Sequence, residues 1–277
     1  MLRTDAKLYA SKFRPLYSWR VASAGALASA VLVCASLASA QTDLHSAQQF
    51  GVLGASTVTN TGPTVVTGLV GVFPGSAITG FPPGTAFMAT HTVSQQGQSD
   101  ASNAFTNLGS TATTQDLSGQ NLGGMTLTPG VYSFSSSAQL TGSLFLNFLG
   151  NANSVFIFKI KSTLTTASNS SVVETGGPGA NVFWLVGSSA TLGTGTVFQG
   201  NIIAKESITL NTDASISCGR AIALTGAVTM DSNVISNDCG ADSGPPGGST
   251  VPEPGSMALL GTGLVGLVPF ARRRRID

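Results

Sequence analysis

Short runs of alternating apolar and polar residues dominate the chain from residue 41 to 240. They are rich in Thr, Ser, Gly and β-branched residues and are separated by turn formers, which is typical of β-strands. One segment differs, because its apolar residues recur at helical spacing among polar ones. The pattern predicts a mainly β domain over 41–240 with one amphipathic helix at about 86–110, weakened by Gly97. The helical apolar positions are Val93, Ala101, Ala104, Phe105 and Leu108.

Four segments after the predicted helix share the pattern T-[L/M]-x-[T/S]. They are 163–166, 191–194, 209–212 and 229–232, and their starts lie 28, 18 and 20 residues apart. About 18–20 residues suit one turn of a β-solenoid, in which stacked turns bury a core that no single turn can bury. The segment 57–60, T-V-T-N, resembles this pattern but precedes the helix, so we expect a discontinuous solenoid.

We expect the apolar residues of these turns to form the solenoid core. They are Phe156, Ile157, Phe158, Val182, Phe183, Trp184, Val197, Ile202, Ile208, Leu210, Ile222 and Val228.

A stack of such turns would align its threonines in a ladder. Adjacent strands lie about 4.7–4.9 Å apart, so the ladder would present a regular grid of hydroxyls and methyls. β-branched side chains have few rotamers, so this grid is stiff before it meets a ligand. A rigid, weakly charged grid can hold water in an ice-like lattice, although Thr is also frequent in strands for propensity alone. The candidate residues are Thr57, Asn60, Thr163, Thr166, Thr191, Thr194, Thr209, Thr212, Thr229 and Ser232.

Charge is scarce and unevenly placed. Only 9% of the 277 residues are charged, far below the roughly 25% of ordinary soluble domains. Nine of the 13 Lys and Arg residues lie in 3–20 and 272–275, which leaves four basic and nine acidic residues over 41–250, a net charge of −5. No basic stripe remains there, which argues against nucleic acid as a partner.

Catalytic and metal-binding motifs are missing. The sequence has no G-x-S-x-G elbow, P-loop or H-E-x-x-H motif, and neither His45 nor His91 has a neighbour at metal-ligand spacing. Asp231 and Asp238 could be imagined as a carboxylate pair of a polysaccharide-active enzyme, but turn formation explains them better. We expect no enzyme, metal or cofactor.

The N-terminus predicts export. Residues 1–20 are basic, 21–37 are apolar, and 38–40 read Ala-Ser-Ala, so 1–40 is predicted to be a signal peptide removed by signal peptidase; the alternative is an uncleaved anchor. Removal of Cys34 leaves Cys218 and Cys239 as an even pair in an oxidising compartment. They are candidates for a disulfide, with two free buried cysteines as the alternative.

The C-terminus contains a second predicted targeting segment. A Gly/Pro/Ser linker at 241–250 precedes an apolar stretch at 255–270 and a basic cluster. This order resembles the PEP-CTERM sorting signal of Gram-negative bacteria, which implies transient membrane insertion, cleavage by an exosortase and delivery to the outer surface or exopolysaccharide matrix. A plain C-terminal anchor is the alternative. The residues that carry the resemblance, within 251–277, are Pro252, Glu253, Pro254, Arg272, Arg273, Arg274 and Arg275.

Stretches along the body resemble a known family. They lie at 57–64, 75–84, 127–132, 155–158, 181–184 and 200–204. In order and over roughly 44–237, they are similar to the microbial ice-binding proteins. The resemblance implies a right-handed solenoid of triangular section, one long helix packed alongside, and adsorption of a flat face to ice. A T-[A/G]-x-[T/N] motif of some members adds Thr61, Thr64 and Asn169 as candidates.

Two functions follow from these observations. The first is an extracellular ice-binding protein that acts through a flat, Thr-rich solenoid face, as an antifreeze or an inhibitor of ice recrystallisation. The alternative is a structural or adhesive matrix protein that uses the same fold to bind extracellular polysaccharide, which suits the sorting signal. A carbohydrate-active enzyme is disfavoured because catalytic groups are lacking.

Overall fold

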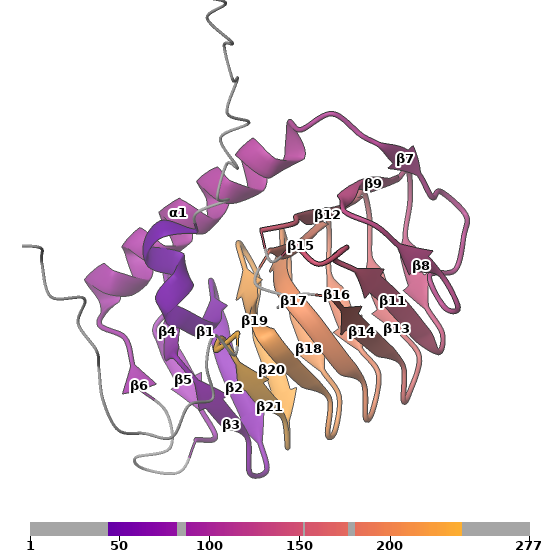
Figure 1. Cartoon of the computed structure of the whole chain (residues 1–277). Coiled ribbons are helices and arrows are strands. Elements are labelled where there is room, and N and C mark those ends of the chain that lie inside the picture. The colour runs from indigo at the N-terminus through magenta and orange to yellow at the C-terminus, as the bar shows by residue number, and fades with distance from the viewer. Residues whose placement is uncertain (1–43, 82–86, 152, 177–180, 240–277) are drawn as a thin grey trace, which may run out of the picture. The chain divides into compact units, whose positions relative to one another are not determined.

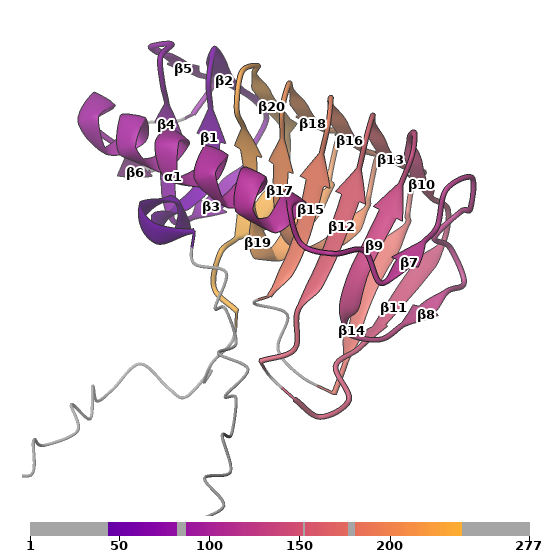
Figure 2. The ribbon, with the colours of Figure 1, turned by 90° about the horizontal axis from the view of Figure 1, so that it is seen from above.

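The structure is a computed structural model that describes residues 44–81, 87–151, 153–176 and 181–239. Parallel strands are wound into a β-solenoid, and one α-helix lies alongside it (Figures 1 and 2). A complete turn contributes one strand to each of three faces. The predicted mainly β, discontinuous solenoid with one helix is confirmed.

The first face is the main path of a 14-stranded sheet, and helix α1 (His91–Gly109) runs across it (Figure 1). Its strands, in spatial order, are β6 (Phe87–Met88), β4 (Leu69–Val72), β1 (Phe50–Gly54), β19 (Ser215–Ala223), β17 (Val197–Ala204), β15 (Val182–Val186), β12 (Phe156–Ile160), β9 (Gly130–Phe134) and β7 (Gln115–Asp116).

The second face is a separate seven-stranded sheet, whose strands follow one another along one side of the stack in Figure 2. Its order is β10 (Ala138–Leu140), β13 (Leu164–Thr166), β16 (Ala190–Leu192), β18 (Ile208–Leu210), β20 (Val228–Asp231), β2 (Thr57–Thr61) and β5 (Ala77–Thr79). The third face is the rest of the 14-stranded sheet, which branches from the main path at the first halves of β17 and β19. It also contains β8 (Thr126–Leu127), β11 (Ser143–Asn147), β14 (Ser171–Thr175), β21 (Val234–Ser236) and β3 (Val65–Thr67).

The chain does not build the stack in sequence order. Strand β1 pairs with the next N-terminal strand, β4, on one side and with the late strand β19 on the other, where Val52 lies opposite Ala221. Strand β2 likewise pairs with β20. The N-terminal turns therefore stack on the last C-terminal turn, while α1 carries the chain to the far end of the solenoid.

Inward-facing residues form one continuous core. In-register pairing places Tyr132, Phe158 and Trp184 in a column, with ring centroids 5.3 and 3.9 Å apart. The Trp184 indole N–H donates to the Gln199 carbonyl at 3.0 Å. Trp184 is fully buried, as the sequence predicted. Stacked rings contribute dispersion and pair energies beyond burial alone, so this column stabilises the packing of β9, β12 and β15.

All the predicted core residues are buried except Val197, which is 48% exposed. It begins β17 on the third face, where its side chain points outward because it alternates with the buried Phe198. Three other predicted core residues, Ile157, Phe183 and Ile222, face the helix instead of the solenoid interior.

Helix α1 lies within the predicted 86–110. Thr90 caps it, because its hydroxyl accepts the Val93 N–H at 3.5 Å. Ala101, Ala104 and Leu108 are buried against the first face, as their spacing predicted. A Cβ added to Gly97 would lie 2.6 Å from Cε2 of buried Phe50, so glycine permits close approach of helix and sheet.

The two ends of the described domain are tied together. Asp100 on the helix accepts the Ser46 N–H and hydroxyl at 3.1 and 2.5 Å, which holds the short helix η1 (His45–Gln49). Arg220 donates to the Gln48 carbonyl through Nε and Nη2. Near this point Cys218 and Cys239 form a disulfide with Cα atoms 4.2 Å apart, so the structure does not have the two free thiols of the alternative.

The predicted signal peptide, the linker and the sorting segment lie outside the described residues. Within the described part, α1 and η1 do not meet the length and hydropathy that a membrane-crossing helix requires.

Candidate functional site

A ladder of threonines runs along the seven-stranded face. The strand register places Thr79 beside Thr59, Thr59 beside Thr229, and Thr229 beside Thr209. Thr209 then lies beside Thr191, and Thr191 beside Thr165. Gln139 of β10 ends the row. Six consecutive strands therefore carry a threonine at the same position, and at about 4.8 Å per strand the row is about 24 Å long.

Strand alternation turns these side chains outward. Thr209 stands between Ile208 and Leu210, which are buried, and Thr191 stands between Ala190 and Leu192, which are also buried. The inward residues hold the strand against the core, so the threonine is left on the solvent side. The T-L pattern of the sequence thus encodes an outward hydroxyl next to an inward apolar group.

The ladder is hydroxyl-rich and nearly uncharged. Thr59 donates to the Thr229 hydroxyl at 3.3 Å, and this is the one side-chain hydrogen bond between ladder threonines in the described residues. The other ladder hydroxyls are therefore available to water. Among all residues of the seven strands, Asp231 alone is ionisable, and it lies at the end of β20.

A second row of small hydroxyl residues borders the ladder. Backbone hydrogen bonds from Ala138 to Thr163 and from Leu164 to Ser189 continue the sheet before β10 and β13. Thr163 lies in this row, and its hydroxyl donates to Ser137 at 2.8 Å. Ser137, Thr163 and Ser189 therefore form a short second row of small polar side chains, beside one end of the ladder.

The predicted ladder needs a correction of register at two strands. The shared sequence pattern matched Thr163 with Thr191, but the structure places Thr165 there. It likewise matched Thr57 with the later threonines, whereas Thr59 pairs with Thr229 and Thr57 pairs with Ala77. Thr191, Thr209 and Thr229 lie in the ladder as predicted.

Three candidate residues are too buried to meet a flat surface. Thr166 and Thr64 are each 3% exposed and Asn60 is 7% exposed. The Thr166 hydroxyl bonds to Thr196 and accepts the Gly193 N–H, and the Thr64 hydroxyl accepts the Asn233 N–H. These side chains fasten one turn to the next, so their prediction as surface contacts is wrong.

The remaining candidates form the corner between the second and third faces. Asn169 and Ser232 have φ of 58° and 55°, a left-handed conformation that Asn tolerates and that reverses the chain. Backbone hydrogen bonds from Asn169 to Thr194 and from Ser232 to Thr61 join successive corners. Thr61, Thr194 and Thr212 are exposed along this edge.

The other two faces are less suited to a flat ligand. Helix α1 covers the first face (Figure 1). The third face exposes apolar side chains, at Val65 (57%), Val234 (55%) and Val197 (48%). The 14-stranded sheet also has register shifts at β1 and between Gln199 and Asn201, whereas the paired strands of the seven-stranded sheet have none over the described residues. In the part of the chain that the structure describes, the seven-stranded face is therefore both uncovered and regular.

Asp231 and His91, which were considered for catalysis or metal binding, make contacts that stabilise the fold. Asp231 accepts the Thr212 and Ser232 hydroxyls, at 2.5 and 3.1 Å. His91 packs edge-on against Phe73, with ring centroids 4.7 Å apart. Within the described ranges, no three His, Cys, Asp or Glu side chains gather as a metal ion would require.

Comparison with known proteins agrees with this geometry. The family described as Ice-binding-like matches residues 52–236, and the PEP-CTERM protein-sorting motif matches 250–275. An ice-binding protein from Nostoc sp. (strain HG1) is 58% identical over 84% of this chain and 87% of its own.

Solved structures agree as well. An ice binding protein from an Antarctic Biological Consortium has a TM-score of 0.67 at 39% identity, over 70% of this chain and 90% of that one. The ice-binding protein from the Antarctic ascomycete Antarctomyces psychrotrophicus has a TM-score of 0.65 at 39% identity, over 71% and 98%. The chain therefore belongs to the ice-binding-like family and carries a PEP-CTERM sorting motif.

Proposed function

We propose that this protein binds ice through the seven-stranded face, with the threonine ladder at the centre of the contact. The observation that carries the proposal is the in-register row of Thr79, Thr59, Thr229, Thr209, Thr191 and Thr165. Relatives and structural neighbours described as ice-binding proteins support it.

The physical basis is preorganisation. Each ladder threonine offers a methyl group and a hydroxyl at a fixed spacing, and its rotamer is restricted by β-branching. The backbone beneath is fixed by parallel pairing and by buried neighbours such as Ile208 and Leu210. Water held in a regular lattice over such a row can merge with a crystal face, and little entropy is lost because the surface is already ordered. No catalytic group is needed.

Single substitutions test the proposal. Thr209→Tyr places a large side chain in the middle of the row and lifts the face away from a flat crystal. Thr67→Tyr is the matched control, because Thr67 is an exposed strand threonine on the third face. We expect the unsubstituted protein and Thr67→Tyr to stop ice grain growth in a frozen sucrose film, and Thr209→Tyr to lose most of this activity with an unchanged melting temperature. Equal activity of the two variants would refute the assignment of the face.

We also propose the route by which the protein reaches ice. The predicted signal peptide at 1–40 and the sorting motif support export, removal of the two ends by signal peptidase and an exosortase, and retention at the outer surface or matrix of a Gram-negative cell. Mass spectrometry of the protein recovered from the native cell surface tests this route. A mature chain that begins at Gln41 and lacks the Arg272–Arg275 cluster is expected, and an intact C-terminus would instead indicate an anchor.

A further inference from the structure

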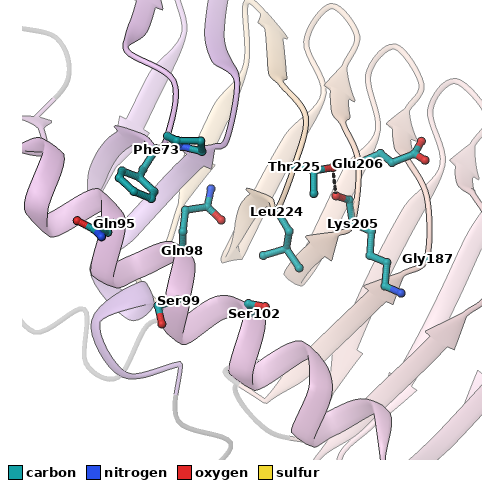
Figure 3. A pocket seen from close by; sticks show the side chains of 11 residues that line it. Phe73, Gln95, Gln98, Ser99, Ser102, Gly187, Lys205, Glu206, Leu224 and Thr225 are labelled. Atoms are coloured by element: carbon teal, nitrogen blue, oxygen red, sulfur yellow. Dashed lines mark hydrogen bonds between the residues drawn. The ribbon is translucent and has the colours of Figure 1, made fainter.

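A cavity of about 700 Å³ opens between helix α1 and the turns that follow β15, β17 and β19. Figure 3 shows Gln95, Gln98, Ser99 and Ser102 along the helix side, with Leu224 across from them. Its volume lies within the roughly 300–1,000 Å³ typical of small-molecule sites. The cavity is separate from the threonine ladder, because its walls are the helix and the corner turns.

The two charged residues of the cavity wall already have partners. Lys205 holds its ammonium nitrogen 5.5 Å from the centre of the Phe105 ring. The Glu206 carboxylate accepts the Ser188 hydroxyl at 2.8 Å. The two charges are also of opposite sign, so the cavity offers no concentrated charge to an anionic or cationic ligand.

Gln98, an uncharged residue of the cavity wall, has a polar atom that is still available to a ligand. Gln98 is 8% exposed, and its amide nitrogen donates to the Ala223 carbonyl at 2.9 Å, which fixes the orientation of the side chain. Its carbonyl oxygen Oε1 is buried and accepts no hydrogen bond from the described part of the chain. A buried acceptor without a donor is unfavourable, so this oxygen is suited to a hydroxyl group brought by a ligand or by water. In Figure 3 the Gln98 amide extends from the helix between Phe73 and Leu224.

We propose that this cavity binds a neutral saccharide unit. A pyranose ring has an apolar face that can pack against Phe73 and Leu224, and its hydroxyls can donate to Gln98 Oε1 and bond to the Ser99 and Ser102 hydroxyls. A phosphate would need unpartnered cations, and a lipid chain would need an all-apolar wall. The site would attach the protein to a glycan while the seven-stranded face remains exposed to ice. Because the cavity and the threonine ladder are made of different residues, this inference does not depend on the proposed function.

The test measures sugar binding by saturation-transfer NMR on protein purified after expression of the 277-residue chain. Maltotriose, cellotriose and chitotriose are the probes, each alongside its monosaccharide to separate recognition of a single ring from that of a chain segment. Ser102→Trp fills the cavity, and Asn103→Trp is the matched control at the next exposed helix position. Gln98→Met removes the amide at similar volume.

At least one probe is expected to bind with a millimolar dissociation constant. Ser102→Trp should weaken this binding at least tenfold, Gln98→Met should weaken it, and Asn103→Trp should leave it unchanged. Melting curves establish that each variant is folded, and ice activity should be the same in Ser102→Trp as in the unsubstituted chain. Absence of transfer to all probes, or transfer that survives Ser102→Trp, overturns the proposal and leaves water as the partner of Gln98.

Discussion

The carboxyl group of Glu174 lies in an unfavourable position, and this has a measurable consequence. Glu174 on β14 pairs in register with Leu146, which is fully buried, so its side chain is directed towards the interior. Its Oε1 atom is buried and has no hydrogen-bond partner among the described residues. Burial disfavours the ionised form and raises the pKa of Glu174 from 4.5 to about 7.

The raised pKa makes the protein less stable as the pH rises. Between pH 4.5 and 7 the folded carboxyl keeps its proton while the unfolded one loses it, so folding takes up a proton and the free energy of unfolding falls. At about 1.4 kcal/mol per pKa unit the full effect would be about 3 kcal/mol. Part of the side chain remains open to water, which reduces the effect to about 1–2 kcal/mol.

Urea unfolding of the unsubstituted protein and of Glu174→Gln, at pH 4.5 and pH 8, measures this difference. Glutamine keeps the shape and removes the ionisation. At pH 8 Glu174→Gln should be more stable by about 1–2 kcal/mol, and at pH 4.5 the two proteins should differ little. All other groups are common to both proteins and cancel. An equal pH dependence for the two proteins would refute the reasoning.

Three further variants test the packing and the disulfide. Gly97→Ala should lower the free energy of unfolding by about 1 kcal/mol in urea, because the clash with Phe50 (about 1–3 kcal/mol) outweighs the gain in helix propensity of about 1 kcal/mol; a stabilised variant would contradict the close approach. Replacing Cys218 and Cys239 together by Ser should cost about 3 kcal/mol in thermal unfolding, since the bridge spans 21 residues, and reducing agent should then have no further effect. Trp184→Ala should cost about 3–5 kcal/mol, whereas a loss below 1 kcal/mol would show that the ring stack is not central to the core.

The general architecture could be predicted because local sequence patterns determine which segments form strands and which forms the helix. Alternation and turn residues predicted the strands, and the spacing of Ala101, Ala104 and Leu108 predicted the helix and its buried side. The early T-V-T-N segment predicted the discontinuity, which the pairing of Thr59 with Thr229 confirms.

The register of the ladder could not be predicted from the same patterns. Strand side chains alternate with a period of two, so sliding a strand by two residues leaves every side chain on its original face. Thr163 and Thr165 therefore fit the sequence pattern equally well, and only the three-dimensional pairing with Thr191 selects Thr165. The first and fourth positions of the pattern are three residues apart, so within one strand they point to opposite faces. Thr166, at a fourth position, is accordingly buried.

Packing also reverses the meaning of Gly97. In a helix a glycine is locally unfavourable, which is all that sequence reasoning can detect. Its benefit is the contact with Phe50, which lies 47 positions earlier in the chain. No local sequence pattern predicts a contact between residues so far apart in the chain.

The most direct test of the central claim is the fraction of protein taken into a slowly growing ice sphere. The measurement compares the unsubstituted protein, the double variant Thr191→Tyr/Thr209→Tyr and the third-face control Thr67→Tyr, all with matched melting curves. Incorporation of the unsubstituted protein and the control, with exclusion of the double variant, is the predicted result. Equal incorporation of all three would show that the threonine ladder does not carry ice binding.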